Sequence, residues 1–436
     1  MIEVKLLFEK IIQLKSNKLI GRTFIYSASA ALNSLIAFAL LPVLTHYLSV
    51  TDYGIIEVFT TIVAFFSGVV LFGGDTLLSK EYFNKDAVNR LLITGKILGG
   101  ICTAAISWII FITVLTYCIP SFAIAINVGS DLLYLAIFVS TLNAIIQMFL
   151  TYCQLEKNAK LFATVVNSRT IIDISISLIF IMVWGMKWQG RILGILIAAV
   201  IFFILVLILF KKRNITISWP ATYWNTILFT GGPLIIAHLS GWTGEMINKI
   251  MINSMLDTPS VGLYSLGFRF GMIVMMIEAA FSRAWMPYFF ENISLNDENA
   301  NRKIVKVTYI YILGLIIFTL LYGVLGKYLL YFMVDKKFYS ASQFILLISI
   351  AYCFDGIWKM FIGYLIHHGK TKIYSNIVLF VAILNVILNY YLIKYFGLIG
   401  SAWSMTIAYF IGTLLTIYFA VTIHPMPWKK YSYLWR

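Results

Sequence analysis

Ionisable side chains interrupt several long apolar runs of this sequence, where they could bind a polar ligand or an ion. Three acid–base pairs are spaced four residues apart: Arg169 with Asp173, Glu245 with Lys249, and Asp355 with Lys359. Residues four apart share a helix face, so each acid can neutralise its base. Arg269 and Glu278 share one further run but stand too far apart to pair, so we expect their partners to come from elsewhere.

Two interpretations of these charges are open, because an ionisable group is costly in hydrocarbon and needs either a partner or a wet cavity. In the first, the pairs tie helices together and bind nothing. In the second, they line a polar, net-cationic cavity. The candidate phosphate or sugar ligands are then Arg169, Lys249, Arg269, Arg283 and Lys359, and the candidate ion-coupling acids are Asp173, Glu245, Glu278 and Asp355. Glu57 and Arg283 lie near predicted helix ends, where snorkelling to the interface is at least as plausible.

Two prolines fall within predicted membrane helices. Pro42 lies in the first apolar run, and Pro233 follows two glycines in the seventh. Proline frees a carbonyl and bends a helix. The two residues are therefore either gating bends or simple packing kinks.

No motif for catalysis or metal binding is visible. The four cysteines stand alone in apolar runs, without metal-ligand spacing or a nearby histidine. Gly369-Lys370-Thr371 resembles the end of a phosphate-binding loop, but Tyr364 stands where its first glycine should be. We therefore expect a protein that is not an enzyme and holds no metal or cofactor, apart from coupling to H⁺ or Na⁺.

The composition predicts the elements that must position these side chains. Of 436 residues, 61% are hydrophobic and only 12% are charged, which excludes a soluble or disordered chain. The apolar runs are long and do not alternate, so the chain is predicted to be an all-α polytopic membrane protein. Twelve membrane helices are expected at 24–46, 53–74, 91–118, 130–153, 162–184, 190–210, 224–250, 260–288, 305–325, 341–366, 371–393 and 398–422.

Lysine and arginine gather in alternate loops, which predicts that both termini are cytoplasmic. The net charge of +15 is then a topology signal and an attraction to anionic lipid, and nucleic-acid binding is not expected. The predicted parts are an amphipathic cytoplasmic segment 1–22, an N-lobe 23–210, a cytoplasmic linker 211–223, a C-lobe 224–422 and a cytoplasmic tail 423–436.

The two predicted six-helix lobes contain short, weakly similar segments, which we call the internal echo. Tyr53-Gly54-Ile55 recurs as Val261-Gly262-Leu263, in both cases in the loop after the first helix of a lobe. An even number of helices in each lobe gives a parallel repeat about an axis along the membrane normal. A substrate is then expected between the lobes near mid-depth.

Several motifs, taken in order, resemble oligosaccharide flippases of the Wzx type, in the multidrug/oligosaccharidyl-lipid/polysaccharide (MOP) exporter superfamily. They lie at 24–26, 41–45, 49–54, 261–265, 281–287, 369–371 and 397–402, and the likeness spans nearly the whole chain. The resemblance implies a MATE-like fold. It also implies alternating access that moves a polyprenyl-pyrophosphate-linked O-antigen or related unit from the cytoplasmic to the outer leaflet of a bacterial inner membrane.

The resemblance also implies functional association with a glycan polymerase and glycosyltransferases. One departure stands out: where the family often has an Asp-Arg pair late in helix seven, this chain has Asn248-Lys249. The positive charge is kept but the acid is lost, which puts an ion-coupling role at this position in doubt. The main alternative function is a cation-coupled multidrug exporter of the same superfamily.

Overall fold

The computed structural model describes residues 18–83, 87–118, 129–219, 246–295 and 297–428. This described part is helical and contains no strand. Eleven of its helices are long and apolar enough to cross a membrane. The predicted all-α polytopic membrane fold is therefore confirmed. Most of the predicted seventh helix lies outside the described residues, although residues 246–255 are helical.

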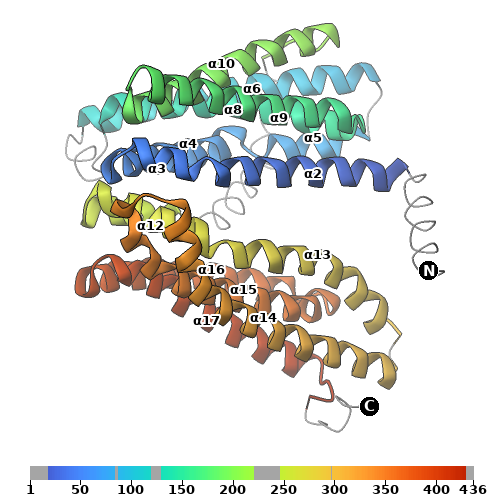
Figure 1. The fold of residues 1–436 in the computed structure, drawn as a ribbon. Helices are drawn as coiled ribbons and strands as arrows, with labels where there is room; N and C mark the ends of the chain where they lie inside the picture. The colour runs from blue at the N-terminus through green and yellow to red at the C-terminus, as the bar shows by residue number, and fades with distance from the viewer. Residues whose placement is uncertain (1–17, 84–86, 119–128, 220–245, 296, 429–436) are drawn as a thin grey trace, which may run out of the picture. The chain divides into compact units, whose positions relative to one another are not determined.

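The helices of the first half can be followed by their labels in Figure 1. They are α2 (Lys18–Ala39), α3 (Leu41–Tyr47), α4 (Val50–Leu71), α5 (Gly74–Tyr82), α6 (Ala87–Cys118), α8 (Ser130–Leu155), α9 (Ala159–Leu178), the π-helical η1 (Ile179–Val183) and α10 (Lys187–Lys212). Pro42 stands in the first turn of α3, just after the helical run breaks at Leu40. A role for Pro42 as a gate stays a prediction, and Pro233 lies outside the described residues.

The second half contains longer helices after the short helical stretch 246–255. They are α12 (Thr258–Gly271), α13 (Ile273–Ile293), α14 (Glu298–Met333), the 3-10 segment η2 (Lys336–Ala341), α15 (Ser342–His367), α16 (Thr371–Phe396) and α17 (Leu398–Ile423). Most ends agree with the hydropathy estimate to within a few residues. One exception is the span predicted at 53–74, which continues through α5 to Tyr82. The other is α14, which extends beyond the predicted 305–325 at both ends. Its N-terminal extension is polar and includes an i,i+4 ion pair between Glu298 and Arg302.

The chain forms two compact units that do not divide at a single point. One contains Met1–Leu48 and Phe59–Leu239, and the other contains Ser49–Val58 and Ser240–Arg436. The first turns of α4 therefore pack with the second unit, whereas the rest of the helix packs with the first. This division matters for the site, because Glu57 lies on the part of α4 that belongs to the second unit.

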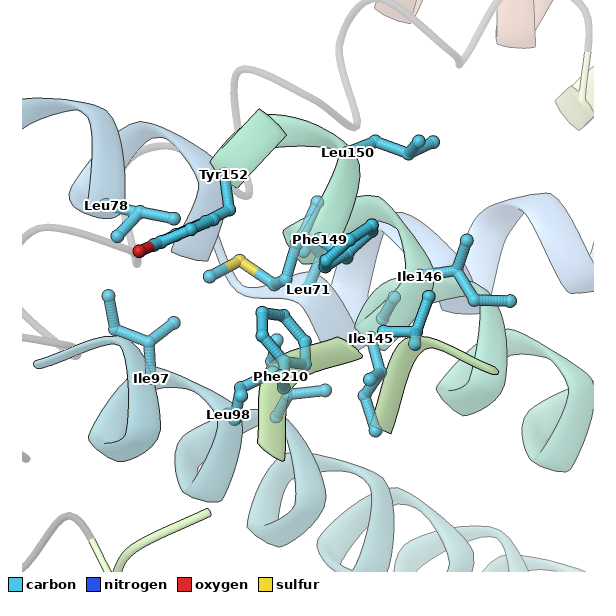
Figure 2. Close-up of a cluster of buried hydrophobic side chains, with 14 of the residues drawn as sticks. Leu71, Leu78, Ile97, Leu98, Ile145, Ile146, Phe149, Leu150, Tyr152 and Phe210 are labelled. Atoms are coloured by element: carbon cyan, nitrogen blue, oxygen red, sulfur yellow. The ribbon is translucent and has the colours of Figure 1, made fainter. Parts of the chain in front are cut away.

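The first unit is held by an apolar cluster drawn from six helices. Figure 2 shows Leu71 of α4, Leu78 of α5 and Leu98 of α6 gathered around the aromatic side chains of α8 and α10. The rings of Phe149 and Phe210 meet edge to face, with their centroids 5.2 Å apart. Between membrane helices such packing is stabilised by van der Waals contacts, because lipid is as apolar as these side chains. This cluster fixes one end of the helices that carry the polar groups of this unit.

The two glycines of the internal echo pack against each other in the second unit. A Cβ placed on Gly262 would lie 2.6 Å from the Val50 carbonyl oxygen and 3.0 Å from the Gly54 amide nitrogen. A Cβ on Gly54 would collide with the Thr258 carbonyl. These glycines let the starts of α4 and α12 approach closely, which a side chain on either would prevent.

Gly262→Ala is expected to lower the free energy of unfolding by about 1–3 kcal/mol, because backbone atoms must move apart to admit the methyl group. Gly314→Ala in α14 is the matched control. A Cβ there meets nothing within 4 Å, so the better helix propensity of alanine should stabilise the helix slightly. Denaturant titration in mixed micelles measures both changes. Equal effects of the two substitutions would contradict the close approach.

Three of the five histidines gather where α15 and α17 end. His368 Nε2 lies 3.0 Å from His424 Nδ1, and the His367 ring is close to both. Burial lowers the pKa of His424, and the neighbouring His368 and His367 lower it further. The unfolded chain therefore binds a proton at this position more readily than the folded chain.

Stability is accordingly expected to decline as the pH falls below about 6.5, the usual histidine pKa. The contribution of His424 is complete above that value and is lost as the pH approaches its lowered folded-state pKa. His424→Gln should make the decline shallower. Unfolding midpoints of wild type and variant between about pH 8 and about pH 5.5 test this. Parallel pH profiles would contradict it.

Candidate functional site

Glu57 accepts hydrogen bonds from two cations inside the second unit. Lys249 Nζ lies 3.1 Å from Glu57 Oε2, and a terminal guanidinium nitrogen of Arg269 lies 2.7 Å from Oε1. The Glu57 side chain is only 2% exposed, whereas 38% of the Arg269 side chain is accessible. We call these three residues the first triad. It holds two positive charges and one negative charge.

The close approach of the two glycines explains how this triad forms. Glu57 lies one turn after Gly54 on α4, and Arg269 lies two turns after Gly262 on α12. Side chains at these spacings share the helix faces that carry the glycines. The helices therefore meet closely enough for the carboxylate to reach the guanidinium. The expectation that Glu57 snorkels is wrong, because the packing of α4 against α12 buries it.

A second triad joins α13 and α15. Lys359 Nζ lies 2.7 Å from both Glu278 Oε1 and Asp355 Oδ2. The Glu278 side chain is fully buried, and the Lys359 side chain is 34% exposed. Ser282 donates a long hydrogen bond of 3.4 Å to Glu278. The expected Asp355–Lys359 pair is confirmed. Glu278 pairs with Lys359, and so has a partner on another helix, as expected from its distance from Arg269.

The second triad has a charge imbalance among its three residues. It has one carboxylate more than it has cations, so a proton or a monovalent cation would balance it. Uncompensated charge is costly where water is scarce. The second triad can thus bind a small cation, whereas the first triad presents the partly exposed side chain of Arg269.

The expected pairing of Arg169 with Asp173 in the first unit is wrong. Asp173 instead pairs with Arg191 of α10, with nitrogen–oxygen distances of 2.5 and 3.2 Å. Gly194 permits this, because a Cβ at that position would collide with Ser177 of α9. Arg169 donates to Asn143 Oδ1 at 2.5 Å and makes no ion pair with any described residue. In the sequence, Gly194 lies three residues after Arg191 in α10, and this spacing is the signal that indicates the role of Arg191.

The remaining predicted site residues are dispersed. Arg283 is exposed, and its Nε donates to the Ala279 carbonyl one turn earlier on α13. Glu245 lies outside the described residues, so its predicted pairing with Lys249 stays a prediction. Within the described residues, no group of three or more His, Cys, Asp or Glu is placed to hold a metal ion.

Comparison with known proteins shows which families the chain matches. The family described as polysaccharide biosynthesis protein matches residues 20–293, and the MatE family matches residues 233–391. A protein of the Lsg locus of Haemophilus influenzae is 23% identical over 412 residues, which cover 90% of this chain and 98% of the relative.

Solved structures of transporters share the fold. The lipid II flippase MurJ in its inward closed conformation aligns with a TM-score of 0.68 at 14% identity, over 91% of this chain and 87% of MurJ. An inward-facing MATE multidrug resistance transporter of the MOP superfamily aligns with a TM-score of 0.59 at 16% identity, over 92% and 94% of the two chains. The family match spans more than half of the sequence. The chain therefore belongs to the polysaccharide biosynthesis protein family.

Proposed function

We propose that the chain is a flippase for a polyprenyl-pyrophosphate-linked oligosaccharide, such as an O-antigen or related surface polysaccharide unit. The substrate moves from the cytoplasmic to the outer leaflet of a bacterial inner membrane by alternating access. A pyrophosphate and a hydrophilic glycan cannot cross hydrocarbon unaided. Cations that are held inside apolar helices and keep accessible atoms can replace the hydration of the phosphate groups.

The partial exposure of the Arg269 side chain is the observation that carries the proposal. Its partner Glu57 is buried, yet 38% of the Arg269 side chain is exposed. A guanidinium binds phosphate oxygens through two parallel hydrogen bonds, and Lys249 adds a point charge beside it. Phosphate oxygens are equivalent acceptors to the Glu57 carboxylate, so the substrate can compete with Glu57 for both cations.

The other candidate residues take supporting roles in the proposal. Arg169, Arg283 and Lys359 contact further phosphate oxygens or anionic sugars along the path. Glu278 and Asp355 carry the coupling ion, H⁺ or Na⁺, because their triad lacks one positive charge. Asp173 and Glu245 are further coupling candidates, and Pro42 and Pro233 serve as gating bends.

The arrangement in the membrane belongs to the same proposal. Segment 1–22, linker 211–223 and tail 423–436 lie on the cytoplasmic side, with lobes 23–210 and 224–422 in the bilayer. Both termini are then cytoplasmic. A glycan polymerase and glycosyltransferases that act on the same glycan are the expected functional partners.

A cation-coupled multidrug exporter is the alternative function, and it is favoured by the MatE match over residues 233–391. A binding site for cationic drugs needs an accessible surplus of negative charge. The most exposed side chain of the first triad is instead that of an arginine. The electrostatics of this site therefore favour an anionic lipid substrate.

Reconstitution of the full chain in vesicles tests the two functions against each other. Fluorescent polyprenyl-pyrophosphate-linked oligosaccharide, extracted from the bacterium that makes it, is expected to become accessible to an enzyme on the opposite leaflet only when the protein is present. Ethidium uptake driven by an imposed H⁺ or Na⁺ gradient is expected to stay at the level of empty vesicles. Ethidium transport without glycolipid movement would reverse the assignment.

A further inference from the structure

A group of polar side chains in the first unit lacks hydrogen-bond partners. Tyr26 Oη and Asn33 Oδ1 on α2, and Asn167 Oδ1 on α9, are buried atoms to which no described residue offers a hydrogen bond. An unpaired polar atom at membrane depth is costly, because hydrocarbon cannot satisfy it. A group of three on neighbouring helices indicates a place where a polar ligand completes the bonding.

The contacts between α2 and α9 place these atoms on one polar face. The Tyr26 and Phe162 rings pack edge to face with centroids 4.9 Å apart, and Asn167 Nδ2 lies 3.5 Å from Ser29 Oγ. From the first contact to the second, the residue numbers increase on both helices, so α2 and α9 run parallel. Asn33 lies one turn beyond Ser29 on the same face of α2. This register brings Asn33 close to the level of Arg169.

Asn33 and Asn167 lie well inside the predicted hydrocarbon region, whereas Tyr26 stands at the start of its span. Asn33 is about 12 Å along the candidate span Ile25–Tyr47, and Asn167 is about 12 Å along Ala159–Val183, at 1.5 Å per residue. Arg169 follows Asn167 by two positions, so its side chain leaves α9 on the opposite side, where it donates to Asn143 Oδ1 of α8 at 2.5 Å.

The chemistry of the unpaired atoms selects the ligand. The side-chain oxygens of Asn33 and Asn167 are acceptors only, so the ligand must bring hydrogen-bond donors. An ionised phosphate has acceptors alone and cannot serve. Sugar hydroxyls and N-acetyl N–H groups are donors, and neighbouring hydroxyls on a sugar ring suit a carboxamide. We propose that Tyr26, Asn33 and Asn167 form a subsite for the glycan of the substrate.

This inference rests on the proposed flippase function and divides recognition between the two units. The first triad in the second unit binds pyrophosphate, which every substrate of the class shares. The subsite in the first unit binds sugars, which differ among substrates. The subsite therefore sets which glycan is accepted.

Native mass spectrometry of the purified full chain, titrated with two lipids, tests the division. The probes are undecaprenyl pyrophosphate and the undecaprenyl-pyrophosphate-linked oligosaccharide extracted from the bacterium that makes it. Wild type is expected to bind the glycolipid about tenfold or more tightly than the bare lipid, as two added hydrogen bonds would give. Asn33→Leu combined with Asn167→Leu should remove that preference and leave binding of bare undecaprenyl pyrophosphate unchanged.

Thermal stability separates a binding role from a structural one. Leucine has the same branched side-chain skeleton as asparagine and removes the unsatisfied oxygen, so the double variant should unfold at the same temperature as wild type or higher. Ser34→Ala is the matched control, because this exposed neighbour of Asn33 bonds back to the Ala30 carbonyl and should change nothing. Asn33→Leu alone gives the same test if the double variant does not fold.

Two outcomes would overturn the subsite. One is a loss of affinity for both lipids together with a lower unfolding temperature, which indicates a structural role. The other is equal binding of the two lipids by wild type, which leaves the pyrophosphate site and the flippase function intact. If wild type binds neither lipid, the flippase proposal itself fails, and the subsite fails with it.

Discussion

Lys359→Met is expected to lower the free energy of unfolding by about 3–5 kcal/mol. The substitution leaves the fully buried Glu278 and the neighbouring Asp355 without the ammonium that lies 2.7 Å from each. Two carboxylates that face each other without a cation must repel or take up a proton, and both changes cost free energy. Denaturant titration of the purified protein in mixed micelles measures the loss.

Arg302→Met is the matched control for this substitution. Arg302 also makes an ion pair of 2.7 Å, but with Glu298, whose side chain is 60% exposed. Exposed pairs of this kind contribute about 0–1 kcal/mol. The triple variant Glu278→Gln, Asp355→Asn, Lys359→Met should recover most of the lost stability, because it removes the uncompensated charges. A loss at Lys359 no larger than that at Arg302 would show that the triad is well hydrated.

Hydropathy alone predicts most of the fold, because a membrane helix is recognisable in the sequence as a long apolar run. Most described spans lie within a few residues of their expected places, apart from the span that continues to Tyr82 and the two ends of α14. The N-terminal end of α14 lies beyond the apolar stretch, where the helix continues through charged residues. Hydropathy contains no information about this end, whereas the Glu298–Arg302 spacing does.

The ion-pair partners are much harder to predict from the sequence. Spacing within one helix correctly identifies Asp355 with Lys359. The same rule fails for Arg169 and Asp173, because Arg191 of the next helix reaches Asp173 first. A partner on another helix depends on which faces pack together, and one sequence does not contain that information directly. The i,i+4 rule therefore finds candidates but does not choose between local and distant partners.

Glycines are the sequence signal that indicates some of these partners on other helices. Gly194 in α10 and the pair Gly54 and Gly262 each mark a close helix crossing beside an ion pair. The sequence showed the last two as an internal echo, without indicating that they touch. A search for ionisable residues one or two turns from such glycines would have brought Glu57 and Arg269 together. Small residues at crossings and polar groups beside them are a general feature of membrane helix packing.

Arg269→Gln is expected to reduce glycolipid flipping about 10- to 100-fold, the effect of losing charge-assisted hydrogen bonds worth about 1.5–3 kcal/mol. The loss in stability should be smaller, about 1 kcal/mol, because Arg269 is partly exposed and Lys249 still neutralises Glu57. Flipping in reconstituted vesicles and denaturant titration give the two measurements. Arg302→Gln serves again as the control, with both quantities unchanged.

The double variant Glu57→Gln, Arg269→Gln separates a ligand-binding arginine from a structural one. It removes the Lys249–Glu57 pair as well, and both of these side chains are buried, so stability is expected to fall below that of Arg269→Gln. If Arg269 only ties α12 to α4, flipping should fall in step with stability across the two variants. If Arg269 binds pyrophosphate, flipping is already lost in Arg269→Gln, the more stable of the two. Glu57→Gln alone should then bind undecaprenyl pyrophosphate more tightly than wild type, because the substrate no longer competes with the carboxylate for both cations.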